Sequence, residues 1–137
     1  MWWIFALLSA FFAALTAIFA KVGIKGVDTD LATAIRTAVI LVVAWGIAFF
    51  RGGTATMYTL TRQNLLFLCL SGIATGLSWV FYFKALQLGK VSQVAPVDKM
   101  SVAIAIILAV IFLGEPLTWK TALGASMIIG GSLVLIS

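Results

Sequence analysis

The sequence predicts an all-α integral membrane protein, a bundle of five transmembrane helices, and three observations predict this class. Apolar residues make up 64% of the chain and charged residues only 9%, whereas soluble domains contain about 45 to 50% apolar residues. The mean hydropathy is +1.21. Apolar runs recur along the chain, and each is close to the roughly 20 residues that cross a bilayer as a helix. The lipid bilayer is therefore the first expected partner.

The first two helices are expected at about residues 2–20 and 31–50. The first begins with a pair of tryptophans, which is typical of an anchor at the membrane interface. It has no positively charged segment before it, so we interpret it as a membrane span and not as a signal peptide. Asp30 is the expected N-cap of the second helix.

The remaining helices are expected at about residues 64–84, 92–113 and 118–136. Ser92 is the expected N-cap of the fourth helix, which places Pro96 at the end of its first turn. Proline has no N–H, so one backbone carbonyl near Ser92 loses its helical partner and must face protein, water or ligand. Interrupted helices of this kind bind substrates or coupling ions in transporters, although proline is also common in first turns that bind nothing.

Composition excludes several classes of function. The net charge is +5, but the basic residues are dispersed, whereas nucleic-acid binding needs them clustered on one face. The chain has no histidine and one cysteine, Cys69, so we expect no metal site, no cofactor and no intrachain disulfide. Catalysis needs paired acids or a nucleophile with its base, and we predict no enzyme because the acids are scattered. The four acids are Asp28, Asp30, Asp98 and Glu115.

The basic residues near the helix ends are almost equally divided between the two sides of the predicted bundle. One side has Arg51, Arg62 and Lys120, and the other has Lys21, Lys25, Lys84 and Lys90. An excess of basic residues on one side normally sets the orientation of a membrane protein. An odd number of helices with balanced charge predicts that copies insert in both orientations and pair as an antiparallel homodimer, the inverted arrangement of many transporters. The alternative is that shifted helix ends hide a real bias.

Two charged residues inside the predicted spans form the main candidate site. Arg36 and Asp98 lie about five and six residues into helices that start from the same membrane side, on the order of 8 to 9 Å below the surface. We predict that they pair, because adjacent helical residues do not face each other and Lys99 is poorly placed to neutralise Asp98. Lys84 is the second candidate partner. The alternative is a purely structural pair, with Lys84 and Lys99 reaching the headgroups.

The signs of these charges favour an anionic or zwitterionic solute. Arg36, Lys84 and Lys99 against one Asp98 leave a positive balance in the predicted cavity. The alternative is cation efflux with Asp98 as proton carrier, but basic neighbours disfavour the protonated acid. Trp79, Tyr82 and Trp45 are candidates for lining the solute path, or they pack and mark the interface.

Small residues predict where helices approach one another closely. Gly72 and Gly76 form a GxxxG pattern in the third helix, and Ser126 and Gly130 form a related pattern in the fifth. Such patterns allow close backbone approach. They are compatible with a dimer interface in the fifth helix and with ordinary packing inside one chain.

The block Ala95-Pro96-Val97-Asp98-Lys99-Met100-Ser101, followed by Gly114-Glu115 and Gly124, resembles the EamA domain of the drug/metabolite transporter superfamily, in its five-helix bacterial and archaeal group. The resemblance spans nearly the whole chain, so residues 1–137 are expected to form a single domain. It implies half of a ten-helix fold, hence dimerisation, and transport of small metabolites or drugs, often export. It also implies a prokaryotic inner membrane.

The resemblance carries over to some residues and not to others. Small multidrug exporters of the superfamily use a glutamate in their first helix, and the first helix here has none. Glu115 matches the family's Gly-Glu pair at a helix C-terminus, where the dipole disfavours an acid. We interpret Glu115 as structural, with Lys120 or Arg51 as its basic partner. We thus predict a secondary transporter working by alternating access, with a non-transporting membrane subunit as the competing class.

Overall fold

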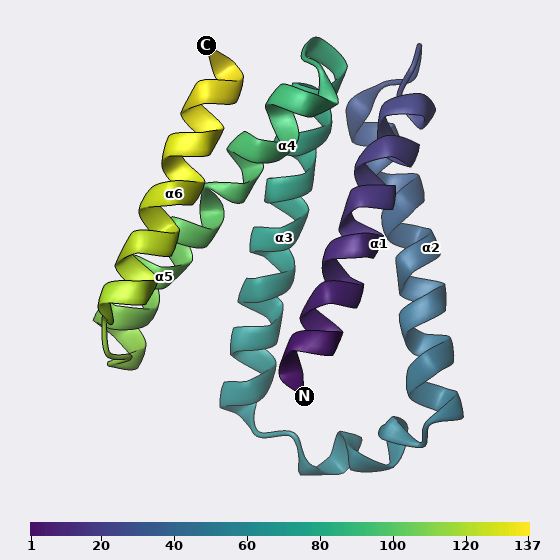
Figure 1. Ribbon diagram of the computed structural model, residues 1–137. Helices are drawn as coiled ribbons and strands as arrows, with labels where there is room; N and C mark the ends of the chain where they lie inside the picture. Colours follow the sequence, from purple (N-terminus) through teal and green to yellow (C-terminus); the bar gives the residue numbers. More distant parts are fainter. The chain divides into compact units, whose positions relative to one another are not determined.

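The computed structural model describes residues 1–137, and its regular elements are helices only (Figure 1). The predicted all-α class is confirmed, and five helical stretches are long and apolar enough to cross a membrane. The chain is therefore a multi-pass integral membrane protein. In order, the elements are α1 (Trp2–Gly23), α2 (Thr29–Phe50), the short 3₁₀ helix η1 (Gly53–Thr59), α3 (Arg62–Leu88), α4 (Val91–Lys99), α5 (Ser101–Leu113) and α6 (Trp119–Ile136).

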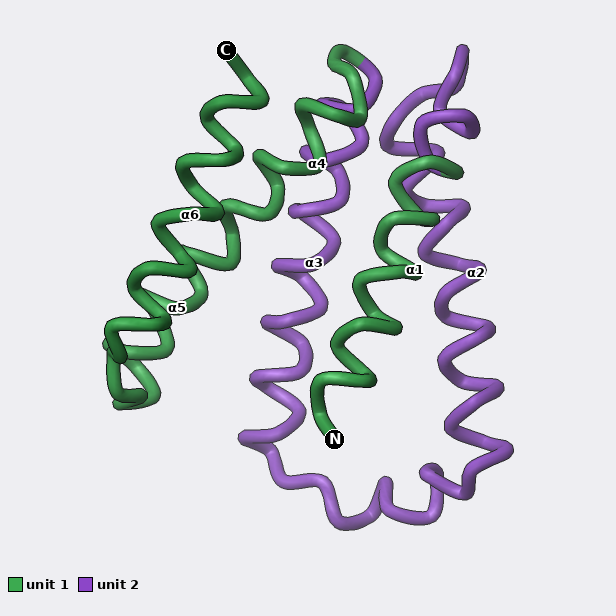
Figure 2. The backbone as a smooth tube through the Cα atoms, in the orientation of Figure 1, with its two compact units in different colours: residues 1–19, 88–137 green, residues 20–87 purple.

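The chain divides into two compact units, coloured separately in Figure 2. Residues 20–87 form one unit, in which α2 and α3 run in opposite directions and η1 joins them at one end. Residues 1–19 and 88–137 form the other, in which α4 and α5 both pack against α6. We call them the central unit and the terminal unit.

Few side chains are buried within the chain. Phe83 and Leu86 are the largest fully buried ones, while most large apolar side chains of the helices are exposed. In water such a surface would be unfavourable, but in a bilayer the lipid tails cover it. The backbone groups and the few polar side chains of the spans must instead find hydrogen-bond partners within the protein.

The N-cap of α2 is Asp28, so the prediction of Asp30 is wrong by two residues. The Asp28 carboxylate accepts hydrogen bonds from the backbone N–H groups of Asp30 at 3.1 Å and Leu31 at 3.0 Å. Its φ of −61° and ψ of 133° are the extended conformation of a cap. Asp30 lies in the first turn, where an acid is favourable but accepts no cap bond.

The predicted fourth helix, at 92–113, is two helices with Met100 between them. The first starts at Val91 after an extended Lys90 that makes no side-chain cap bond, so Ser92 is not the N-cap as predicted. Pro96 consequently lies in the second turn of α4 and not in its first. Together the two helices still make one stretch of membrane-spanning length, Val91–Leu113.

The helix η1 was not predicted, because its residues show no apolar periodicity. Gly52 has a φ of +73°, a conformation that glycine adopts without steric cost, and it turns the chain out of α2. Threonine hydroxyls then support the tight turns, with Thr56 Oγ1 donating to the carbonyl of Gly53 and Thr59 Oγ1 donating to that of Thr56. Local hydrogen bonds from side chains to the backbone therefore stabilise η1, although its sequence has no periodic pattern of apolar residues.

We expect Asp28→Ala to lower the free energy of unfolding by about 0.5 to 2 kcal/mol, because two backbone N–H groups lose their acceptor. Asp30→Ala is the matched control, since it removes the same charge from the same turn without removing a cap bond. Unfolding in mixed micelles, followed by far-UV circular dichroism, measures both. A larger loss for Asp30→Ala than for Asp28→Ala would contradict this assignment of the cap.

Candidate functional site

In the central unit, Arg36 of α2 is stacked on aromatic side chains of α3. Its guanidinium carbon lies 3.9 Å from the ring centroid of Trp79 and 5.2 Å from that of Phe83. The two rings are four residues apart and so share one face of the helix. The Tyr82 ring, with its centroid 6.3 Å from that of Phe83, belongs to the same aromatic group. The structure thus brings together three of the predicted residues, Arg36, Trp79 and Tyr82.

Hydrogen bonds hold this end of α3 in place. The Lys21 ammonium donates to the carbonyl of Leu86, and Gln87 Nε2 donates to the carbonyl of Val27 at 3.1 Å. Leu86 is in the last turn of α3, where carbonyls have no helical donor and a positive charge is favourable. Lys21 therefore supplies a hydrogen-bond donor at the end of α3 whose Trp79 and Phe83 rings contact Arg36.

No carboxylate of its own unit neutralises the charge of Arg36. The guanidinium contacts two aromatic rings and forms no ion pair within the unit. Arg36 is the eighth residue of α2, so it lies about 10 Å along the helix from its first residue, Thr29. A cation–π contact occupies none of the five N–H donors of the guanidinium. Such donors match a carboxylate or phosphate in a bidentate arrangement.

In the terminal unit, Asp98 forms an ion pair with Lys99, at 3.2 Å between Oδ2 and Nζ. The expectation that these adjacent residues do not pair is wrong. They are the last two residues of α4, and where a helix ends the long lysine side chain can turn back to its neighbour. The Lys99 side chain is 57% exposed and that of Asp98 33%. The predicted pair between Asp98 and Arg36 joins residues of different units and stays a prediction. The same holds for Lys84, an exposed residue of α3.

The interruption of the fourth span has a specific cause in α6. The hydroxyl of Ser132 donates to the carbonyl of Pro96 at 2.9 Å and shares its hydrogen with the carbonyl of Ile128 at 2.7 Å. In a regular helix the N–H of Met100 would bond to Pro96, but here it bonds to Val97 at 3.0 Å. A side chain inserted into the backbone ladder is a known cause of helix breaks. The break thus follows directly after Asp98 and Lys99.

Ser132 was missed by the sequence analysis. It is 4% exposed and lies in a helix of otherwise small and apolar residues, so it looks like one more small residue of a packing pattern. Its position relative to Pro96, 36 residues away, depends on how α4 packs against α6. The available signal was that a hydroxyl buried in a membrane helix must bond to something.

The residues predicted to be structural make few contacts. A Cβ placed on Gly72, Gly76, Gly124 or Gly130 would meet no atom of its own unit within 4 Å, so close packing around these glycines stays a prediction. Glu115 follows Gly114, whose φ is +66°, and its N–H bonds to the carbonyl of Ala109. The expected ion pair with Lys120 is absent, although both residues belong to the terminal unit. Arg51, the alternative partner, belongs to the other unit.

Comparisons with known proteins identify the family. The model of the EamA-like transporter family matches residues 1–137. The chain belongs to this family. It is also 48% identical over 134 residues, 98% of this chain and 95% of the relative, to a Sinorhizobium protein named "Uncharacterized transporter in cobO 3'region". No solved structure matches it significantly. The family and this relative's name support a transporter role for the EamA chain.

We expect Ser132→Ala to lower the free energy of unfolding of this EamA protein by about 0.5 to 1.5 kcal/mol, because the Pro96 carbonyl loses its donor. Ser126→Ala is the control, since Ser126 bonds only to the carbonyl of Ala122 in its own helix. Ser132→Thr retains the hydroxyl and should restore most of the loss. Equal losses for Ser132→Ala and Ser126→Ala in micellar unfolding would show that the bond between α4 and α6 contributes nothing.

Proposed function

We propose that this protein is a secondary transporter that exports a small anionic or zwitterionic organic metabolite from a bacterial cell. It acts in the inner membrane, with residues 1–137 as one functional domain. Two copies in opposite orientations form an inverted dimer, and alternating access moves the solute through it. Membership of a transporter family supports the general role, and the charges of the chain support the class of solute and the mechanism.

The observation that carries the proposal is the arrangement of Arg36. A charged residue inside a membrane span is costly unless it is paired or has a function. Arg36 is held on Trp79 and Phe83, yet no carboxylate of its unit pairs with it. A solute carboxylate or other anionic group would supply that partner. An exporter of organic cations would instead need an unpaired acid, and Asp98 already has Lys99.

The interrupted fourth span supports a second role near Asp98. A break in a membrane helix leaves backbone groups available where the helix axis is interrupted, and transporters use such breaks to bind solutes or ions. The break after Lys99 follows the ion pair directly, and Pro96 is bonded to Ser132 instead of to its own helix. We propose that the Asp98–Lys99 pair opens and closes as a gate, with Lys84 as a further basic contact.

Two features support the antiparallel homodimer. The basic residues near the helix ends are balanced between the two sides, so neither orientation is strongly favoured. The glycines of α3 and α6 have open space around them within their own units, and we propose that they contact a second copy. Five spans per chain would give the ten of a complete inverted repeat.

We expect Arg36→Gln to reduce transport at least tenfold, because a charge-assisted bond to the solute is worth about 1.5 to 3 kcal/mol. Liposomes containing the purified protein are loaded with a mixture of amino acids and organic acids, and released solutes are identified by mass spectrometry. Asp98→Asn should also slow release, while expression and dimer formation persist. Lys120→Gln, which removes a charge outside the proposed path, is the control.

Three results would contradict this proposal. Release by the wild type of nothing beyond what protein-free liposomes release would remove the transport role. Release of organic cations alone, abolished by Asp98→Asn and unaffected by Arg36→Gln, would favour the alternative of cation efflux with Asp98 as proton carrier. Loss of folded protein in both variants would make the two residues structural.

We expect copies of the chain to be present in both orientations. Single cysteines are placed at Lys25→Cys and at Thr56→Cys in a Cys69→Ala background and are labelled in intact cells with a membrane-impermeant reagent. The two sites lie in connections on opposite sides of the membrane, between α1 and α2 and between α2 and α3. Each should be labelled in about half of the molecules. Labelling at one site alone would rule out the inverted homodimer and favour a separate partner, as in a membrane subunit of a larger complex.

A further inference from the structure

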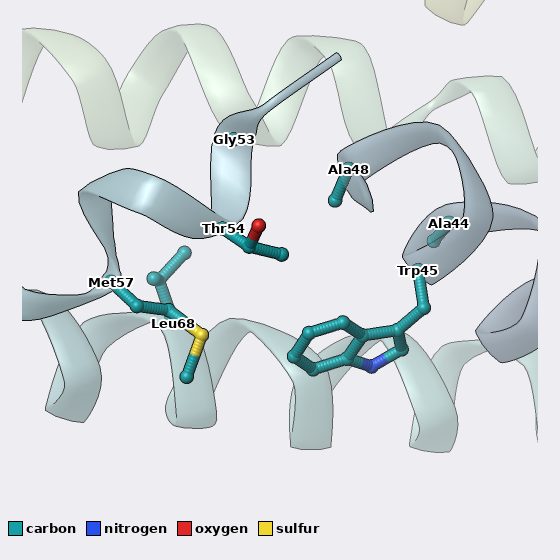
Figure 3. Close-up of a pocket in the computed structure, with 7 residues that line it drawn as sticks. All are labelled: Ala44, Trp45, Ala48, Gly53, Thr54, Met57 and Leu68. Carbon is teal, nitrogen blue, oxygen red and sulfur yellow. The ribbon is translucent and has the colours of Figure 1, made fainter. Parts of the chain in front are cut away.

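An open apolar groove lies within the central unit, at the end where η1 connects α2 and α3. Its volume is about 850 Å³, within the roughly 300 to 1,000 Å³ of sites for small molecules. Trp45 and Ala48 line it from α2, Thr54 and Met57 from η1, and Leu68 from α3. Figure 3 shows Trp45 and Met57 extending into the opening on either side of Thr54. The groove is thus apolar with one hydroxyl.

The charges that adjoin this groove in the central unit have one sign. Arg51 directly follows the last residue of α2, two residues before Gly53 of the groove lining, and Arg62 is the first residue of α3, six residues before Leu68 of the lining. The central unit has no acid after Asp30, and neither arginine forms an ion pair within that unit. Basic sites between membrane helices of this kind attract anionic headgroups.

The element η1 also has the character of an interfacial segment. Met57 is 54% exposed and Tyr58 97% exposed, and tyrosine is enriched where headgroups meet hydrocarbon. An apolar groove lined by the end of α2 fits a hydrocarbon chain, while the two arginines at the adjoining helix ends fit a negative headgroup. We propose that the groove binds one anionic phospholipid, its phosphate on Arg51 and Arg62 and an acyl chain between Trp45 and Met57.

The test measures lipid contact directly and needs no transported solute, so it stands or falls independently of the proposed function. A bimane fluorophore is attached at Tyr58→Cys in the Cys69→Ala protein, beside the groove. The protein is reconstituted in phosphatidylcholine nanodiscs that contain brominated phosphatidylglycerol or brominated phosphatidylcholine, whose chains quench bimane on contact. Val42→Cys, exposed in the middle of α2, gives the control position.

Phosphatidylglycerol should be preferred at the Tyr58 position by about fivefold for each arginine, the effect of one basic residue on an anionic lipid. At Val42 the two lipids should quench equally. Arg51→Gln with Arg62→Gln should abolish the preference, whereas the corresponding double lysine variant keeps the charge and should retain it. Ala48→Phe, which fills the groove without changing a charge, should reduce it.

Three outcomes would overturn the proposal. One is equal quenching by both lipids in the wild type. Another is a preference for phosphatidylglycerol that persists in the double glutamine variant or in Ala48→Phe. Attraction of the headgroup would then not depend on the arginines or on the groove. The third is a label that neither lipid reaches while a cross-linker at the same cysteine joins two chains, which would make the groove the contact surface of a second copy.

Discussion

The constraint on which the structure depends is that a backbone carbonyl or N–H in hydrocarbon must find a partner in the protein. It explains why the regular elements are helices and why several helix ends and breaks have polar partners. The end of α3 is completed by Lys21 at Leu86, and the start of α2 by Asp28. At the break in the fourth span, the Ser132 hydroxyl donates to the carbonyl of Pro96. These three irregularities occur where a polar side chain is available, whereas α4 starts without a side-chain cap.

Arg36 and Asp98, two of the charged groups inside the spans, are stabilised in different ways, and the difference bears on their roles. The guanidinium of Arg36 is weakly hydrated and can stack on rings, so part of its desolvation is offset without a carboxylate from its own unit. Asp98 is instead paired with Lys99. An arginine with no acidic partner in its unit suits binding of an anion, and an ion pair between neighbouring residues at a helix end suits a contact that is made and broken.

The sequence predicted the fold class, the five spans and the transporter family, because these depend on apolar length and on a motif with fixed spacing. It predicted the local details less well. Asp28 and Asp30 are both plausible caps, and only the backbone conformation decides between them. The pairing of Asp98 with Lys99 depends on the helix ending at residue 99, and that end depends on Ser132, which is remote in sequence. The stacking of Arg36 on Trp79 likewise depends on how α2 packs against α3.

The proposed lipid site and the proposed dual orientation constrain each other. In an antiparallel dimer, Arg51 and Arg62 of one copy face one leaflet and those of the other copy face the opposite leaflet. Each basic residue near an anionic surface is worth about 1 kcal/mol, so the three on the side of Arg51 and Arg62 and the four on the other side nearly offset each other. If anionic lipid were confined to one leaflet, the net preference would be about 1 kcal/mol, roughly a fivefold change in an equilibrium. A lipid bound in the groove would add to the side that has three basic residues and would bring the two orientations closer to balance.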